Sequence, residues 1–257
     1  MQNQPNVAGM GKMDSMMSGA SWQRIFARIK LVLTDPKGCW STIQSEPGDM
    51  KSIYMGYIIP VAGFYYLAQF IGAVVWGYSF MGVTYRPSMT SSLTQSLMGF
   101  ILQMVGFAVT AQILSFLAPK FEGRASPEAA LKLLAYSATA TFVAGVFFLI
   151  PIPLSSIVML VLGIYSAYIM WSGIEPMMAV SAAKKIPYAI VSIIASAIVM
   201  LVIGLISAGI TGGAGMNPYM DGTTTGTIKL PGGVTFDPNE AQKSMEQLQR
   251  MMPQTPQ

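Results

Sequence analysis

Long apolar stretches recur five times along the chain, and charged residues, prolines or glycines bound each of them. A bilayer core about 30 Å thick needs about 20 apolar residues in helical form. Each stretch meets that requirement, so the pattern predicts a bundle of five transmembrane helices and an all-α fold. We place the helices at 53–78, 93–117, 131–149, 154–172 and 186–210.

Prolines and caps refine these boundaries. The uncharged run from Leu133 to Ile174 is long enough for two helices, and Pro151 and Pro153 divide it because proline breaks the helical hydrogen-bond ladder. Ser126 followed by Pro127 is typical of a helix start. Pro60 lies inside the first stretch, where we expect a kink.

Residues 21–51 precede the membrane domain and follow another pattern. Ser21 can cap a helix that runs to residue 34, with one apolar face flanked and opposed by basic side chains. Such a helix suits an anionic membrane surface, and the alternative is a helix packed on the protein's own cytoplasmic loops. The candidate membrane-surface residues are Trp22, Arg24, Phe26, Arg28 and Lys30. Asp35-Pro36 ends this helix, and we expect a second short one from Pro36 to Glu46.

The two ends of the chain have soluble composition. Residues 1–20 are rich in Met, Gly and Ser and favour a disordered tail. Thioethers suit Cu(I), but the methionines there show no clean ligand spacing. The membrane domain then covers 52–215, and 216–257 form a tail with a Gly/Thr loop at 221–227 and a candidate helix at 239–252.

Composition and charge agree with a membrane protein. The chain is 53% hydrophobic and only 10% charged, against roughly 25% charged in soluble domains. With five helices, eleven basic residues fall on the N-terminal side and four on the other, which predicts a cytoplasmic N-terminus and an external C-terminus. The four are Arg86, Lys229, Lys243 and Arg250. The expected location is therefore the cytoplasmic membrane of a bacterium.

Several kinds of chemistry are excluded within one chain. There is no histidine and a single cysteine, Cys39, so His-based triads, His/Cys zinc sites and an intrachain disulfide cannot form. A net charge of +4 gives no reason to expect nucleic acid. We expect no cofactor, no catalytic residue and no metal.

Polar groups inside the apolar stretches are few. Gln69, Gln103 and Gln112 favour hydrogen bonds between helices, or else the lining of a polar path. Glu175, at the end of the fourth stretch, is expected to cap or to pair with Lys184 or Lys185. No acid or base lies near the middle of a stretch, which disfavours an ion-coupled transporter.

Three blocks of sequence resemble the bacterial branch of the Yip-domain (Ypt/Rab-interacting protein) family. They are RIKLVLTDPKGCWSTIQSEP before the membrane, SPEAALKLLAYSATATFVAGVFFLIPI around the third helix, and LGIYSAYIMWSGIEPMMAVSAAKKIPYAI across the fourth and fifth. The resemblance, over about residues 24–210, implies five spans and the orientation given above. The Asp-Leu-x-Gly-Pro motif of the eukaryotic members is absent; the candidate loop reads Asp35-Pro36-Lys37-Gly38. Without that motif, the resemblance gives no basis for expecting a GTPase partner.

Three hypotheses for function follow. The first is a non-catalytic membrane scaffold or regulatory subunit that contacts the lipid bilayer and a protein partner or a second copy. The alternative is a small transporter or channel with a polar path through the bundle. A membrane enzyme is the third, and no spacing of acids or bases selects it.

Overall fold

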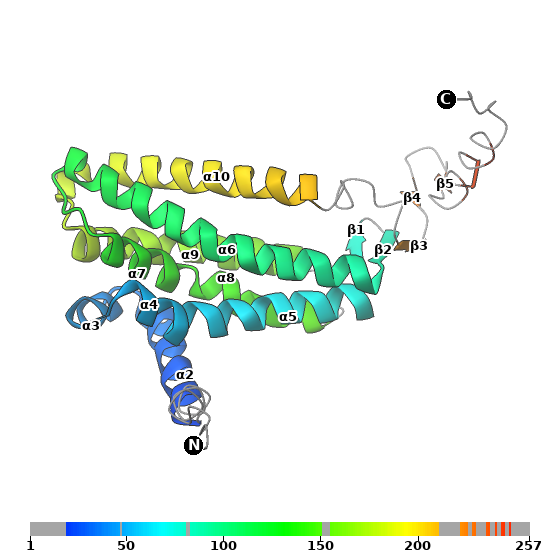
Figure 1. The fold of residues 1–257 in the computed structure, drawn as a ribbon, viewed down its shortest axis with the longest axis horizontal. Helices are drawn as coiled ribbons and strands as arrows, with labels where there is room; N and C mark the ends of the chain where they lie inside the picture. Colours follow the sequence, from blue (N-terminus) through cyan, green and yellow to red (C-terminus); the bar gives the residue numbers. More distant parts are fainter. Residues whose placement is uncertain are drawn as a thin grey trace, which may run out of the picture.

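The computed structural model describes residues 19–46, 48–80, 83–150 and 155–210, with short pieces at 222–225, 228–229, 235–236, 240, 243–244 and 247. Five helical segments in this part are long and apolar enough to cross a membrane. They run alongside one another down the long axis of the molecule (Figure 1). The prediction of an all-α bundle of five transmembrane helices is confirmed.

Two short helices precede the membrane, α2 (Gly19–Thr34) and α3 (Cys39–Ser45). The interruption at Asp35-Pro36 is confirmed, since the Asp35 carboxylate accepts a hydrogen bond from the Gly38 N–H across the turn (2.8 Å). Two details of the prediction are wrong. The first helix begins before Ser21, and the second begins at Cys39 rather than Pro36, because 36–38 form that turn.

The first span changes its helical form close to its proline. It consists of α4 (Met50–Ile53), a π-helical turn η1 (Tyr54–Ile58) and α5 (Ile59–Val75). Pro60 lacks an N–H and its ring clashes with the preceding turn of an α-helix. The wider π turn just before Pro60 relieves that conflict, and such turns are frequent at functional sites.

The second and third spans are joined by a short charged loop. The second is α6 (Met89–Leu117) followed by the 3₁₀ turn η2 (Ala118–Phe121). It starts four residues earlier than expected because Ser88 caps it, accepting from the Ser91 N–H. The third consists of α7 (Pro127–Ser137), α8 (Thr139–Val143) and the 3₁₀ segment η3 (Ala144–Leu149), with the expected cap at Ser126.

The last two spans are α9 (Ser155–Met178) and α10 (Lys185–Ile210), linked by the 3₁₀ turn η4 (Ala182–Lys184). α9 continues past the predicted end at 172, and Pro176 lies within its final turn. It ends where Ala179 adopts a positive φ of 51°. Residues 151–154, with the prolines expected to divide the third and fourth spans, lie outside the described residues.

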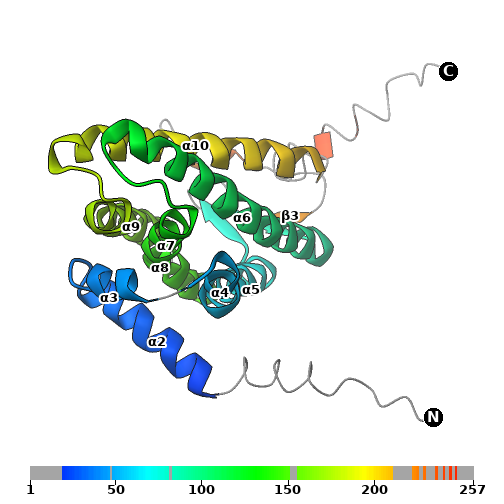
Figure 2. The same cartoon turned by 60° about the vertical axis from the view of Figure 1, so that its left-hand side comes forward.

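The third span is the centre of the bundle. In the most apolar 18 residues of this span, 67% of the positions are buried, against 11% in the fifth span. In Figure 2, α7 and α8 lie between α9 on one side and α4 and α5 on the other. Small residues permit this close packing. A Cβ built on Gly72 would lie 2.3 Å from the Phe148 carbonyl oxygen, and one on Gly145 would lie 2.8 Å from the Tyr65 ring.

A small antiparallel sheet stands at the end of the bundle away from α3. Its strands are β1 (Tyr78–Phe80), β2 (Val83–Pro87) and β3 (Gly222–Thr225), in the order β1-β2-β3. Gly77, with a φ of +74°, leads from α5 into β1. β3 belongs to the C-terminal tail, so part of the predicted Gly/Thr loop is a strand that pairs with residues 84–87. β4 (Ile228–Lys229) and β5 (Thr235–Phe236) form a separate pair.

Candidate functional site

The pre-membrane helices gather at the end of the bundle opposite the sheet. In Figures 1 and 2, α2 runs at a steep angle to the five spans, while α3 lies beside the start of α7. Four residues hold α2 and α3 there, and three of them are charged. We call Arg28, Ile43, Glu46 and Lys132 the helix clamp.

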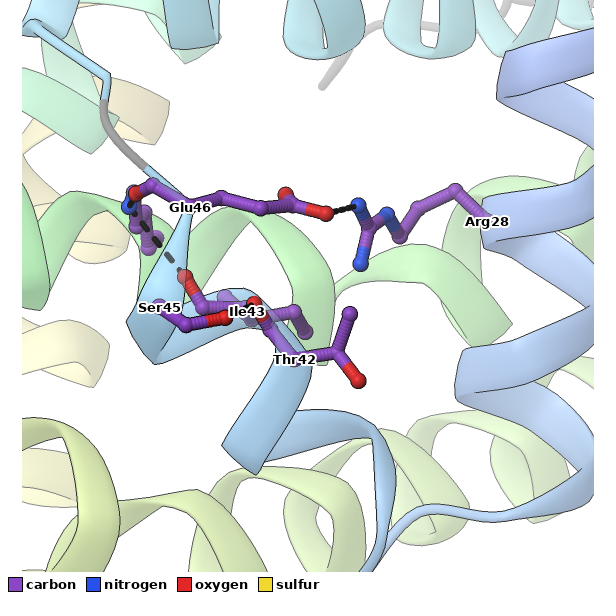
Figure 3. Close-up of polar contacts among 6 residues, drawn as sticks. Arg28, Thr42, Ile43, Ser45 and Glu46 are labelled. Carbon is purple, nitrogen blue, oxygen red and sulfur yellow. Dashed lines mark hydrogen bonds and ion pairs between the residues drawn. The ribbon is translucent and has the colours of Figure 1, made fainter.

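Arg28 joins α2 to the end of α3. One nitrogen of its guanidinium, Nη2, forms an ion pair with Glu46 Oε1 (Figure 3), and the group lies 5.5 Å from the Tyr136 ring centroid. The other terminal nitrogen, Nη1, is buried without a hydrogen-bond partner within the described part of the chain. The Arg28 side chain is 17% exposed. It therefore faces the bundle rather than the lipid headgroups where we expected it, because it lies one helical turn before the buried Val32.

Lys132 joins α7 to α3 and is itself 8% exposed. Its Nζ donates to the carbonyl oxygens of Ile43 (3.2 Å) and Glu46 (2.5 Å). The last carbonyls of a helix have no partner within the helix and carry partial negative charge. Lys132 therefore acts as a C-terminal cap on α3, supplied by another helix.

Trp40 fixes the other side of α3 against α9. It is fully buried, and its Nε1–H donates to Ser172 Oγ (2.8 Å), which lies 2.7 Å from the Pro36 carbonyl oxygen. Gly173 is required there, since a Cβ on it would lie 2.4 Å from the indole. Side chains of α2, α7 and α9 thus meet around α3.

Cys39 is buried beside Trp40, outside the five spans. Burial, reinforced by the negative charge of Asp35, raises the pKa of its thiol to about 11. Because the thiolate is the reactive form, Cys39 is unsuited to nucleophilic chemistry at neutral pH.

The outer face of α2 carries the remaining membrane-surface candidates. Trp22 and Phe26 are 41% and 64% exposed, with ring centroids 6.3 Å apart. Arg24 and Lys30 are also exposed. The expected apolar face is thus split, because Ile25 and Val32 are buried against the bundle while the two aromatic residues point away from it.

The polar residues predicted inside the spans do not converge. Gln103 Oε1 accepts from the Tyr66 hydroxyl (3.4 Å), whereas Gln69 is half-buried with no hydrogen-bond partner among the described residues, and Gln112 is exposed on the outside of α6. Glu175 lies 3.6 Å from Lys185, whose ammonium is 5.1 Å from the Trp171 ring centroid.

Aromatic side chains occupy the region between α5, α6 and the third span. Tyr65 contacts Tyr66, Phe142 and Phe148, and Phe107 contacts Phe142. Among the described residues, this packing and the outward position of Gln112 leave the three glutamines apart from one another.

Chemically, the clamp can orient helices but offers no reacting group. Lys132, Glu46 and Nη2 of Arg28 are engaged in an ion pair or in hydrogen bonds. No cluster of three or more His, Cys, Asp or Glu side chains suited to a metal occurs among the described residues. In the sequence, Lys132 is one of the eleven basic residues that indicate the orientation in the membrane, and no further role was predicted for it. A lysine within the apolar run AALKLLAYS was the signal that could have identified a buried cation.

One family model matches most of the chain. The Yip1 domain model matches residues 30–204, which include α3, Glu46, Lys132, the first four spans and most of the fifth. Neither the curated proteins nor the solved structures contain a match. Since the matched region is well over half of the chain and agrees with the resemblance seen in the three sequence blocks, the protein belongs to the Yip1 domain family.

Proposed function

We propose that this protein is a non-catalytic scaffold or regulatory subunit that presents α3 and the neighbouring loops to a protein partner at the membrane. Yip1-family proteins are generally non-enzymatic. The observation that carries the proposal is the helix clamp, in which buried Lys132 ties α3 to the central span and Arg28 ties α2 to Glu46 at the end of α3. A fold that only had to cross the membrane would not need a short polar helix held in this way.

The exposed side of α3 is the surface that we assign to the partner. Cys39, Trp40 and Ile43 face inward, and the outward residues are polar: Ser41, Thr42, Gln44 and Ser45. The adjoining loops are tied together, since the Arg124 N–H donates to the Met178 carbonyl (2.7 Å) and Ser181 Oγ donates to Glu122 Oε2 (2.8 Å). A rigid polar surface lowers the entropy lost on binding.

The orientation follows from the basic residues. Lys120 in η2, Arg124 in the loop after it and Lys184 in η4 follow or precede the ends of α6 and α10 on the α3 side, and Arg86 belongs to strand β2 of the sheet at the other end (Figure 1). We propose a member of the bacterial branch, in the cytoplasmic membrane, with residues 21–51 on the cytoplasmic side, 52–215 in the membrane and 216–257 outside.

Cysteine labelling tests this orientation. In spheroplasts treated with a membrane-impermeant maleimide, we expect Thr90→Cys to be labelled and Lys184→Cys to be labelled only after the membrane is opened. Both positions are exposed. The unaltered chain is the blank, because buried Cys39 with a pKa of about 11 should not react. The reversed pattern would contradict the proposed topology.

A search for the partner tests the scaffold proposal. The full-length chain is cross-linked in native membranes and extracted in mild detergent, and the proteins that remain attached to it are identified by mass spectrometry. The proposal expects one stoichiometric partner with cross-links at the α3 end, for example at Lys37 or Lys184, which are exposed. Recovery of the chain alone would refute the scaffold proposal and favour the alternative, a small transporter or channel.

A further inference from the structure

Two large aromatic side chains of α2 are exposed. Trp22 and Phe26 leave large apolar surfaces uncovered, while Ile25 and Val32, about a quarter turn away around the same helix, are buried. Two apolar stripes on one helix call for two different apolar neighbours. The bundle supplies the first.

The depth of α2 relative to the spans identifies the second neighbour. Trp171, with the Lys185 ammonium over its ring, has the composition of a membrane–water interface. The Tyr165 hydroxyl donates to the Leu33 carbonyl (2.7 Å), and Tyr165 precedes Trp171 by six residues, or about 9 Å along α9. The C-terminal end of α2 therefore lies on the membrane-centre side of the Trp171 level.

The direction of α2 matches that depth. It runs at a steep angle to the spans (Figures 1 and 2), so a helix anchored at this level extends along the membrane plane instead of leaving it. Lys30, one turn beyond Phe26, is exposed and its long side chain can reach phosphate groups.

We infer that α2 is embedded sideways in the phospholipid leaflet at the clamp end, with Trp22 and Phe26 among the acyl chains at a depth fixed by the helix clamp. Interfacial amphipathic helices bury their apolar face about 5–10 Å into that region, which agrees with the Tyr165 level. Unlike a free amphipathic helix, α2 is held by Arg28 and cannot leave the leaflet without breaking its ion pair with Glu46. This contact extends the proposed function but does not depend on the existence of a protein partner.

A nitroxide attached at Phe26→Cys in the full-length chain, reconstituted in phosphatidylcholine–phosphatidylglycerol bilayers, tests the depth. Oxygen concentrates among acyl chains, while a water-soluble nickel chelate is excluded from them. The lipid reference is Val105→Cys, on the outer face of α6, and the water reference is Lys184→Cys. Native Cys39 is buried and stays in place as the unlabelled background.

We expect the ratio of oxygen to nickel accessibility at position 26 to approach that at position 105 and to exceed that at position 184. A nickel-accessible label would overturn the inference by placing the aromatic face in water. A label shielded from both reagents would also overturn it, because a second copy or another protein would then cover the face.

The clamp is tested by the same label in the Glu46→Gln background. Loss of the ion pair should release α2, so the nitroxide spectrum should become more mobile and the depth less uniform. An unchanged spectrum and depth would show that the clamp does not fix the helix. Thr42→Ser, on the exposed side of α3, is the matched control and should leave both readings unchanged. A failed partner search would leave all these outcomes unaffected.

Discussion

Replacing Gly173 by leucine is expected to displace α3 from the bundle and to destabilise the protein more than any other single change considered in α9. A Cβ at this position would lie 2.4 and 2.5 Å from two atoms of the Trp40 indole and 2.7 Å from Leu133 Cδ1. Neither neighbour can move aside easily, since both are fully buried and Ser172 holds the indole N–H. Overpacking of a core costs about 1–3 kcal/mol, and we expect the upper part of that range.

Gly163→Leu is the matched control because it lies in the same helix and a Cβ there meets nothing within 4 Å. Thermal unfolding of the two variants in lipid nanodiscs gives the comparison. Gly173→Leu should unfold at a clearly lower temperature and Gly163→Leu close to the unaltered protein. Equal melting temperatures would mean that Trp40 does not pack against α9 as described.

Replacing Lys132 by methionine is expected to cost about 2–6 kcal/mol, since it leaves the buried Ile43 carbonyl and the part-buried Glu46 carbonyl without this donor at about 1–3 kcal/mol each. Methionine preserves the length and apolar character of the side chain, so the loss measures the ammonium and its bonds to Ile43 and Glu46. The same change should loosen α3 locally, and trypsin should cut after the exposed Lys37 faster than in the unaltered chain.

Lys120→Met controls for loss of a positive charge at the same end. Lys120 is exposed, with its ammonium 5.0 Å from the Phe116 ring centroid, and substitutions on an exposed surface are usually within about 0.5 kcal/mol. If Lys132→Met were no more destabilising and no more sensitive to trypsin than Lys120→Met, the capping role of Lys132 would be wrong.

The spans were predictable because the bilayer imposes one strong requirement, an apolar stretch of sufficient length, and the charged residues mark where it ends. Their exact limits depend on finer interactions. Ser88 adds a turn to α6 by capping it. Pro176 cannot donate to the carbonyl of residue 172, but only two residues of α9 follow it, so the disruption is confined to the end of the helix.

The candidate site was only partly predictable because its contacts join distant positions. The helical period predicts only that Arg28 lies on the basic side of α2, whereas its orientation toward the bundle depends on Glu46 and Tyr136. Lys132 donates hydrogen bonds to carbonyls more than 80 residues away in the sequence. Nothing local in the Gly/Thr segment signals that β3 pairs with the hairpin between the first two spans. Pairing of this kind is visible only once the fold brings the edge of β2 within reach.

The central claim, that the clamp holds α3 as a partner-binding surface, is tested most directly by the amount of cross-linked partner retained by a surface variant. Ser41→Arg combined with Gln44→Arg alters only the exposed side of α3, and Thr90→Arg makes a similar change at the opposite end of the bundle. We predict that the α3 variant loses the partner while remaining folded, and that Thr90→Arg retains it. Equal recovery by the α3 variant and the unaltered chain would contradict the claim.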